Sequence, residues 1–189
     1  MILTLIRHGE TDYNKNSLIQ GHIDNPLNDT GISQAHKLGT KLKTLNRSFD
    51  FLGSSPLVRA AKTADIISKY TNMEVSFYDK HFMERDFGEF DGKYYFDVLD
   101  NMHDPNYKKT HYENDEMIIK RVKKGIMNLY QNYKGNRVAV VCHSHVIKSL
   151  LIISNPDHYD FNNYFIGNLS ALTFKVNNDK IELIEHLNI

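Results

Sequence analysis

The stretch Ile2-Leu3-Thr4-Leu5-Ile6, followed at once by Arg7-His8-Gly9-Glu10-Thr11, decides the fold class of this chain. A short apolar run rich in β-branched residues predicts a buried strand, and open α/β sheets bind their ligands beyond the ends of such strands. An arginine supplies permanently charged donors for phosphate oxygens, and a neutral imidazole can act as a nucleophile near pH 7. Arg7 and His8 at this strand end therefore point to phosphate chemistry.

Similar apolar runs recur along the chain, and helical patterns separate most of them. The expected strands are Ile2–Ile6, Phe49–Leu52, Val75–Tyr78 and Val138–Val141. The expected helices span 30–45, 55–70, 115–133 and 144–153, with Asp29 or Thr30 capping the first and Ser55 the second. A hairpin at 170–176 and 180–186 ends the pattern. This alternation predicts an α/β fold with a parallel sheet, helices on both faces and at least one antiparallel terminal strand.

Composition limits the partners and the compartment. A chain of 189 residues suits one domain, and a formal net charge of +0 gives no global field to recruit nucleic acid or an anionic membrane. Cys142 is the single cysteine, so we expect no internal disulfide and a cytoplasmic location. No apolar run approaches the roughly 20 residues of a membrane helix. The irregular stretch 92–114 predicts an inserted flap, while the choice between monomer and homodimer stays open.

Two further strand ends carry cationic side chains. Arg59 falls in the first turn of the second expected helix, where free amides and the helix dipole favour an anion. His143 follows a later strand and, when protonated, would donate to the same anion. Taken singly, His8 could be an ordinary strand-end histidine and Arg59 a partner in a surface ion pair. Three such strand ends together predict a phosphate site around His8, with an imidazole that the arginines keep neutral.

Phosphoryl transfer to a histidine also needs a proton donor for the leaving oxygen. Glu84 is the candidate, because the apolar neighbours Phe82 and Phe87 would raise its pKa and keep it protonated near neutrality. Glu89 and Asp91 compete for this role, and a solvated loop position is the plain alternative for all three carboxylates.

Three positions shortly after the first strand add neutral donors. Asn14, Gln20 and Gly21 can offer amide N–H groups to the same anion. These residue types are also typical of ordinary turns, so their positions alone leave both roles open.

In their order along the chain, these motifs resemble the histidine phosphatase superfamily, in its phosphoglycerate mutase-like branch. The matching residues are Arg7-His8-Gly9-Glu10-Thr11 with Asn14, Gly21 to Asp24, Pro26-Leu27, Gly31, Gln34-Ala35, Ser54 to Leu57, Arg59-Ala60, Thr63-Ala64, Glu84, Phe87-Gly88, Gly92 and Val141-Cys142-His143. Three positions depart from the family pattern. Tyr13 stands where tryptophan is frequent, Asp91 replaces a common glutamate, and Ser144-His145 replace a small, glycine-rich pair.

The resemblance implies a three-layer α/β/α sandwich with a mostly parallel six-stranded sheet, formed by one domain at 1–189. It implies that His8 is phosphorylated transiently in a pocket made by Arg7, Arg59 and His143, with Glu84 protonating the leaving group and then helping to activate water. The positions of Asn14 and Gln20 match residues that assist phosphate binding in relatives, and Gly21 and Ser144 are further candidates for phosphate binding in this chain. The implied substrate is a small phosphorylated metabolite, and no metal or cofactor is implied.

Three alternatives to a phosphatase remain. A mutase would return the phosphoryl group to substrate, but the longer mutases carry extra arginines in a larger insert, whereas Tyr94 to Asp115 here contains none. A non-catalytic phosphate-binding protein should lack part of the set that this chain retains. A metal or redox site at Cys142-His143-Ser144-His145 lacks the spaced ligand pairs of structural zinc sites. The sequence therefore favours hydrolysis of small phosphomonoesters, with the physiological substrate left open.

Overall fold

A six-stranded sheet forms the centre of the computed structural model, which describes residues 1–104 and 106–187. The strands are β1 (Ile2–Arg7), β2 (Phe51–Ser54), β3 (Val75–Tyr78), β4 (Arg137–Cys142), β5 (Ala171–Val176) and β6 (Ile181–Leu187). Their order across the sheet is β3-β2-β4-β1-β5-β6. The first four strands pair in parallel, whereas β5 is antiparallel to both of its neighbours. The predicted six-stranded, mostly parallel sheet is thus confirmed.

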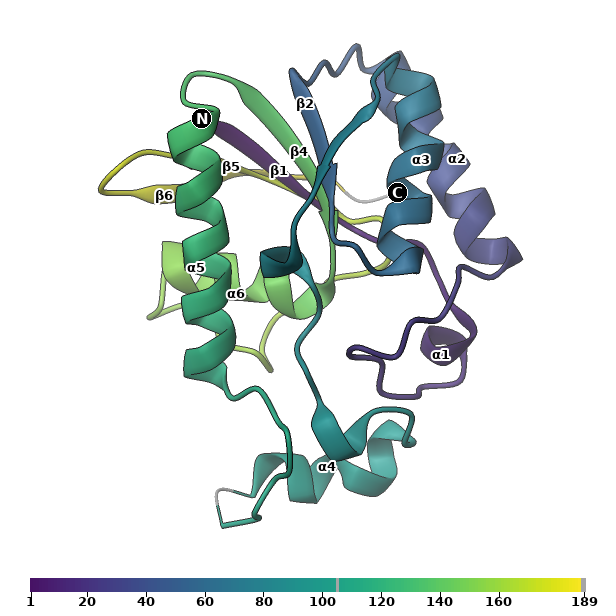
Figure 1. Cartoon of the computed structure of the whole chain (residues 1–189), viewed down its shortest axis with the longest axis vertical. Helices are drawn as coiled ribbons and strands as arrows, with labels where there is room; N and C mark the ends of the chain where they lie inside the picture. The colour runs from purple at the N-terminus through teal and green to yellow at the C-terminus, as the bar shows by residue number, and fades with distance from the viewer. Residues whose placement is uncertain (105, 188–189) are drawn as a thin grey trace.

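Helices cover both faces of this sheet (Figure 1). One face carries α2 (Asp29–Thr44) and α3 (Val58–Thr71), and the other carries α5 (Asp115–Asn132) and α6 (Ser144–Ser154). The short helices α1 (Asp12–Lys15) and α4 (Tyr95–His103) lie toward the bottom of the view, and single 3₁₀ turns span Lys80–Phe82 (η1) and Gly88–Phe90 (η2). None of the helices in the described parts of the chain has the length and apolar character needed to span a bilayer.

Each face of the sheet has its own apolar core, because successive side chains of a strand point to opposite sides. Leu3 and Leu5 of β1 join the core beneath α5 and α6, whereas Ile6 joins the core beneath α2 and α3. In β4, Val140 joins the core beneath α5 and α6, and Val141 joins the core beneath α2 and α3. All five side chains are fully buried, which explains why the central strands read as continuous apolar runs.

Two helix starts differ from the predictions. Asn28, rather than Asp29 or Thr30, caps α2 by accepting a hydrogen bond from the backbone N–H of Gly31. The second predicted helix begins at Val58, because Ser55 and the proline after it form a turn before the helix instead of capping it.

The flap also differs from the prediction. The stretch 92–114 was expected to be irregular, yet it contains α4. Val98 on α4 packs with Ile19 and Phe90 in a small apolar cluster of its own, which fastens the flap to the rest of the molecule.

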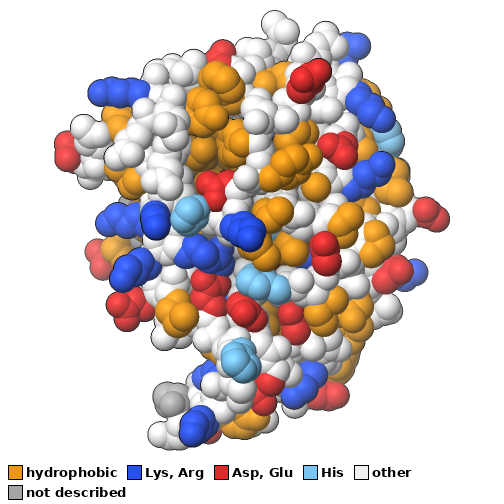
Figure 2. Space-filling model, in the orientation of Figure 1, with side chains coloured by type: hydrophobic (Ala, Val, Ile, Leu, Met, Phe, Trp, Pro, Cys, Tyr) orange, Lys and Arg blue, Asp and Glu red, His pale blue; other side chains and the backbone are white. Residues whose placement is uncertain are grey.

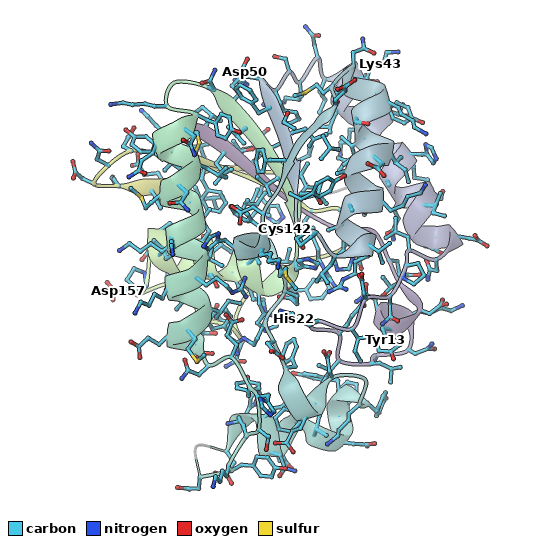
Figure 3. The ribbon with its side chains drawn as sticks, in the orientation of Figure 1. Tyr13, His22, Lys43, Asp50, Cys142 and Asp157 are labelled. Carbon is cyan, nitrogen blue, oxygen red and sulfur yellow. The ribbon has the colours of Figure 1, made fainter. Side chains whose placement is uncertain are left out.

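The parallel strands end at one edge of the sheet, and this edge faces the flap. In Figure 3, Cys142 at the end of β4 lies near the middle of the view, whereas Asp50, just before β2, lies at the top. The residues that follow β1, β2 and β4 are therefore brought together between the sheet and α4, although they are far apart in the sequence.

Candidate active site

His8 follows β1 directly and is buried, with its two ring nitrogens held differently. Nδ1 lies 2.7 Å from the carbonyl oxygen of Gly9, so Nδ1 carries the proton that it donates to this oxygen. Nε2 keeps its lone pair and accepts a hydrogen bond from Arg59 Nε at 3.3 Å. Burial, followed by the charges of Arg59 and Arg7, lowers the pKa of His8 well below its usual value of 6.5. The imidazole is therefore neutral near pH 7, with an unprotonated Nε2 in the site.

Arg59 is fully buried beside this nitrogen, and backbone carbonyls fix its guanidinium. Nη2 donates to the carbonyl oxygen of Gly21 at 2.8 Å and Nη1 to that of Ile23 at 3.0 Å. Asp91 holds the same loop from the other side, since its carboxylate accepts hydrogen bonds from the backbone N–H groups of Gly21, His22 and Ile23. Gly21 was predicted to bind the anion, but its N–H is occupied by Asp91. The carbonyl oxygen of Gly21 instead accepts a hydrogen bond from Arg59 and so helps to fix the guanidinium.

Arg7 and His143 bring further donors to the same place. Arg7 Nη1 donates to the carbonyl oxygen of Ile166 at 2.6 Å, and the ring of His143 lies 5.0 Å from that of His8, centroid to centroid. His143 Nε2 is 2.9 Å from Ser55 Oγ. Within the described residues, Arg7 Nε and His143 Nδ1 are buried without a hydrogen-bond partner. Such unpaired buried polar atoms are rare and require an explanation.

The protonated His143 that the sequence suggested is not favoured by its surroundings. Burial, followed by the charges of Arg59 and His8, lowers the pKa of His143 well below 6.5. The neutral ring still carries one N–H, so His143 can donate a single hydrogen bond to an anion.

Glu84 is buried near the same centre, and the prediction of a raised pKa is wrong. Burial by itself would raise its pKa, but His145, His143 and the backbone N–H of Arg85 outweigh burial and lower it well below 4.5. Oε1 accepts hydrogen bonds from the backbone N–H of Arg85 at 2.9 Å and of His145 at 3.1 Å. His145 is the second residue of α6, so the positive end of the helix dipole also favours the carboxylate. The apolar neighbours identified in the sequence are outweighed by these donors.

Asn14 and Gln20 line the cavity beside His8, as does Ser144 at the start of α6. Asn14 Oδ1 accepts a hydrogen bond at 3.3 Å from Asn168, whose amide also donates to the carbonyl oxygen of His8 at 3.0 Å. In the amide orientation that satisfies both of its ends, Gln20 accepts hydrogen bonds from Arg59 Nε and Nη1, each at 3.2 Å.

Sequence reasoning missed Asn168 and Lys148, which also line this cavity. Asn168 lies in a loop after α6 that carries no motif. Lys148 lies one helical turn beyond Ser144 on α6, and this spacing is the one signal that could have revealed it.

These residues open into a cavity of about 880 Å³ between the body of the molecule and the flap. The flap side is lined by Tyr95, Phe96, Met102, His103, Lys109 and Tyr112. Figure 2 shows charged and histidine side chains gathered across the middle of this face. A site of this size accepts a small molecule, with the anion-binding groups at its base and aromatic side chains at its mouth.

Comparison with known proteins identifies similar sequences. A family model described as "Histidine phosphatase superfamily (branch 1)" matches residues 3–189. The uncharacterised phosphatase PhoE of Bacillus subtilis (strain 168) is 36% identical over 147 residues, which are 78% of this chain and 74% of that protein. Phosphoglycerate mutase-like protein 4 of Arabidopsis thaliana is 31% identical over 166 residues, covering 82% and 71%.

A solved structure shares the fold. Phosphoserine phosphatase of Entamoeba histolytica in complex with 3-phosphoglyceric acid superimposes with a TM-score of 0.83 at 24% identity, over 100% of this chain and 97% of that one. This likeness extends across the sheet and both helical layers.

Proposed function

Because the chain belongs to branch 1 of the histidine phosphatase superfamily, we propose that it hydrolyses small phosphomonoesters through a phosphohistidine on His8. The observation that carries the proposal is the pair of buried nitrogen atoms without partners, Arg7 Nε and His143 Nδ1, around a histidine whose Nε2 is unprotonated. A phosphate dianion would accept hydrogen bonds from Arg7 Nε and, when Ser55 Oγ donates to His143 Nε2 and Nδ1 carries the ring proton, from His143 Nδ1. Arg59 Nε donates to His8 Nε2 at 3.3 Å, and on phosphate binding it would donate to a phosphate oxygen in place of this nitrogen.

The proposed reaction has two steps. In the first, the Nε2 lone pair of His8 attacks phosphorus while the bond to the leaving oxygen breaks, and Glu84 in its acid form protonates that oxygen. In the second, the Glu84 carboxylate takes a proton from water as the water oxygen attacks phosphorus. The N–P bond breaks, which returns neutral His8 and inorganic phosphate. Arg7, Arg59 and His143 stabilise the charge on the phosphoryl oxygens in both steps.

Two features favour water over a second phosphorylated molecule as the acceptor. The flap side of the cavity offers Lys109 and aromatic groups, and no arginine lies between Tyr94 and Asp115 to hold a second phosphate. The proposed partner is therefore a small phosphorylated metabolite. The buried free thiol of Cys142 fits the cytoplasmic location that forms part of the proposal.

The test is hydrolysis of 4-nitrophenyl phosphate by the wild-type protein and by His8→Ala, with and without EDTA. His158→Ala is the matched control, since His158 is exposed and lies outside the cavity. We expect phosphate release by the wild type and the control, none by His8→Ala, and no effect of EDTA. A parallel assay for isomerisation of 3-phosphoglycerate tests the mutase alternative. Isomerisation without phosphate release, or activity that persists in His8→Ala, would refute the proposal.

A further inference from the structure

His145 contacts the proposed acid Glu84 from two directions. Its backbone N–H donates to Glu84 Oε1 at 3.1 Å, and its ring Nδ1 lies 3.6 Å from the same oxygen. Nδ1 is buried and has no hydrogen-bond partner within the part of the chain that the structure describes. A small movement of either side chain would complete a hydrogen bond between this nitrogen and the carboxylate.

Two aromatic rings fix the plane of the His145 imidazole. Phe161 stacks on it with centroids 5.5 Å apart and an angle of 21° between the rings, and Phe87 meets it edge-on at 5.2 Å. The His145 side chain is 22% exposed, whereas that of Glu84 is 7% exposed, and both line the cavity. The imidazole therefore lies between the buried carboxylate and the open part of the cavity.

We propose that His145 is a positioning and proton-transfer residue that supplies Glu84 with the proton for the leaving group and removes it afterwards. This inference rests on the proposed phosphatase function and identifies His145 as the residue that reprotonates Glu84. Protonated His145 gives its Nδ1 proton to Glu84 Oε1, which leaves a neutral imidazole and a carboxylic acid. Glu84 then gives that proton to the leaving oxygen as the P–O bond breaks. When water attacks, its proton passes to Glu84 and back to His145.

The proposal accounts for a difficulty in the site. Two backbone N–H groups stabilise the carboxylate form of Glu84, so Glu84 is not protonated in the resting protein. A general acid of this kind needs a neighbouring donor that titrates nearer to neutral pH. An imidazole is the side chain with that property.

The charges around His145 make proton uptake depend on the substrate. Burial, Arg85 and Lys148 lower the pKa of His145, while Glu84 opposes them. Arg85 is also paired with Asp115 of α5 at 2.7 Å, and Lys148 donates to the carbonyl oxygen of Phe161 at 2.6 Å. A phosphate dianion entering the cavity adds negative charge near His145 and favours its protonated form. The proton would therefore arrive together with the substrate.

The first arm of the test does not depend on turnover. The titration of the His145 ring is followed by NMR in the wild type and in Glu84→Gln, each with and without inorganic phosphate. We expect Glu84→Gln to lower the pKa of His145, and phosphate to raise it in the wild type. Identical titration of His145 in the two proteins would overturn the proposed proton exchange, whether or not the protein is a phosphatase.

The second arm is kinetic and uses esters whose leaving groups differ in basicity. His145→Gln should lower kcat for an alkyl phosphate by about 10-fold, and kcat for 4-nitrophenyl phosphate much less, because a good leaving group needs little protonation. In His145→Ala, added imidazole should restore hydrolysis of the alkyl ester, with a pH dependence that follows the imidazolium form. A purely structural role would not give this rescue. His158→Gln, at an exposed site, is the matched control.

Equal losses for both esters, with no rescue by imidazole, would overturn the role of His145. Absence of phosphatase activity in the wild type would refute the proposed function separately, and the NMR arm would still decide whether His145 and Glu84 exchange a proton. If His145→Ala does not fold, the ester comparison with His145→Gln and the NMR titration give the decision.

Discussion

Acidification should destabilise this protein through the same buried imidazoles that form the site. The native pKa values of His8 and His143 lie well below 6.5, the value expected in the unfolded chain. Above pH 6.5 both rings are neutral in both states, and stability does not depend on them. Below pH 6.5 the unfolded chain binds two protons that the native protein does not, so the free energy of unfolding falls with pH.

The magnitude follows from proton linkage. Each group that is protonated in the unfolded state alone costs about 1.4 kcal/mol per pH unit below its unfolded pKa. For His8 and His143 together the loss between pH 7.5 and pH 5.0 is at most about 4 kcal/mol, which is reached when both rings stay neutral in the native protein; this is a large share of the roughly 5–15 kcal/mol stability of a typical protein. His145, whose pKa is also lowered by burial, adds to this loss. Glu84 contributes further loss only as pH falls below 4.5, because its native pKa is depressed as well.

Urea unfolding between pH 5.0 and 7.5 measures this dependence. The chain has no tryptophan, so circular dichroism is the suitable signal. His8→Gln should remove about half of the two-histidine loss, roughly 2 kcal/mol at pH 5.0. Saturating inorganic phosphate should flatten the wild-type dependence, because the anion favours the protonated rings. His158→Gln is the control and should keep the wild-type slope. Equal stability at pH 5.0 and 7.5, or a full slope in His8→Gln, would refute the reasoning.

Three substitutions test other parts of the structure. Glu84→Gln should lower kcat for an alkyl phosphate by about 100-fold and for an aryl phosphate far less, measured by steady-state kinetics; equal losses would move the acid role elsewhere. Arg121→Met removes the donor to three backbone carbonyls of the 81–84 loop and should destabilise by about 3 kcal/mol in urea unfolding while lowering kcat more than it changes KM. An unchanged kcat would show that the Glu84 loop holds its position without Arg121. Gly31→Ala places a methyl group against the backbone of Glu10 and should cost about 1–3 kcal/mol, whereas Gly167→Ala meets only ordinary contacts; similar melting temperatures for the two variants would contradict this packing.

The sequence predicted the centre of the sheet well, because β1 and β4 are buried on both faces and form continuous apolar runs. It also predicted that Arg7, His8, Arg59 and His143 would meet, since strands of a parallel sheet end at one edge. Asn168 could not be found in this way, because it lies in a loop without periodicity, and only tertiary packing brings its amide to the His8 carbonyl.

Side-chain electrostatics were less predictable than position. Sequence neighbours suggested an apolar environment for Glu84, but the donors that lower its pKa include His145, which lies 61 positions further along the chain. The cap of α2 shows the same limit on a smaller scale. Asn28, Asp29 and Thr30 are all good capping residues, and the backbone angles that select Asn28 are not encoded in residue type alone.

The position of β1 has a consequence for synthesis of the protein on the ribosome. This strand precedes the other five in the sequence, yet it lies between β4 and β5, and Ile2 pairs with Arg137 on one side and Lys175 on the other. At typical translation rates, on the order of ten seconds pass before the first of these neighbours emerges. During that time this apolar strand has no partner, and the nascent chain is exposed to aggregation. A chaperone that binds short apolar segments would therefore find a target in the residues that lead directly to His8.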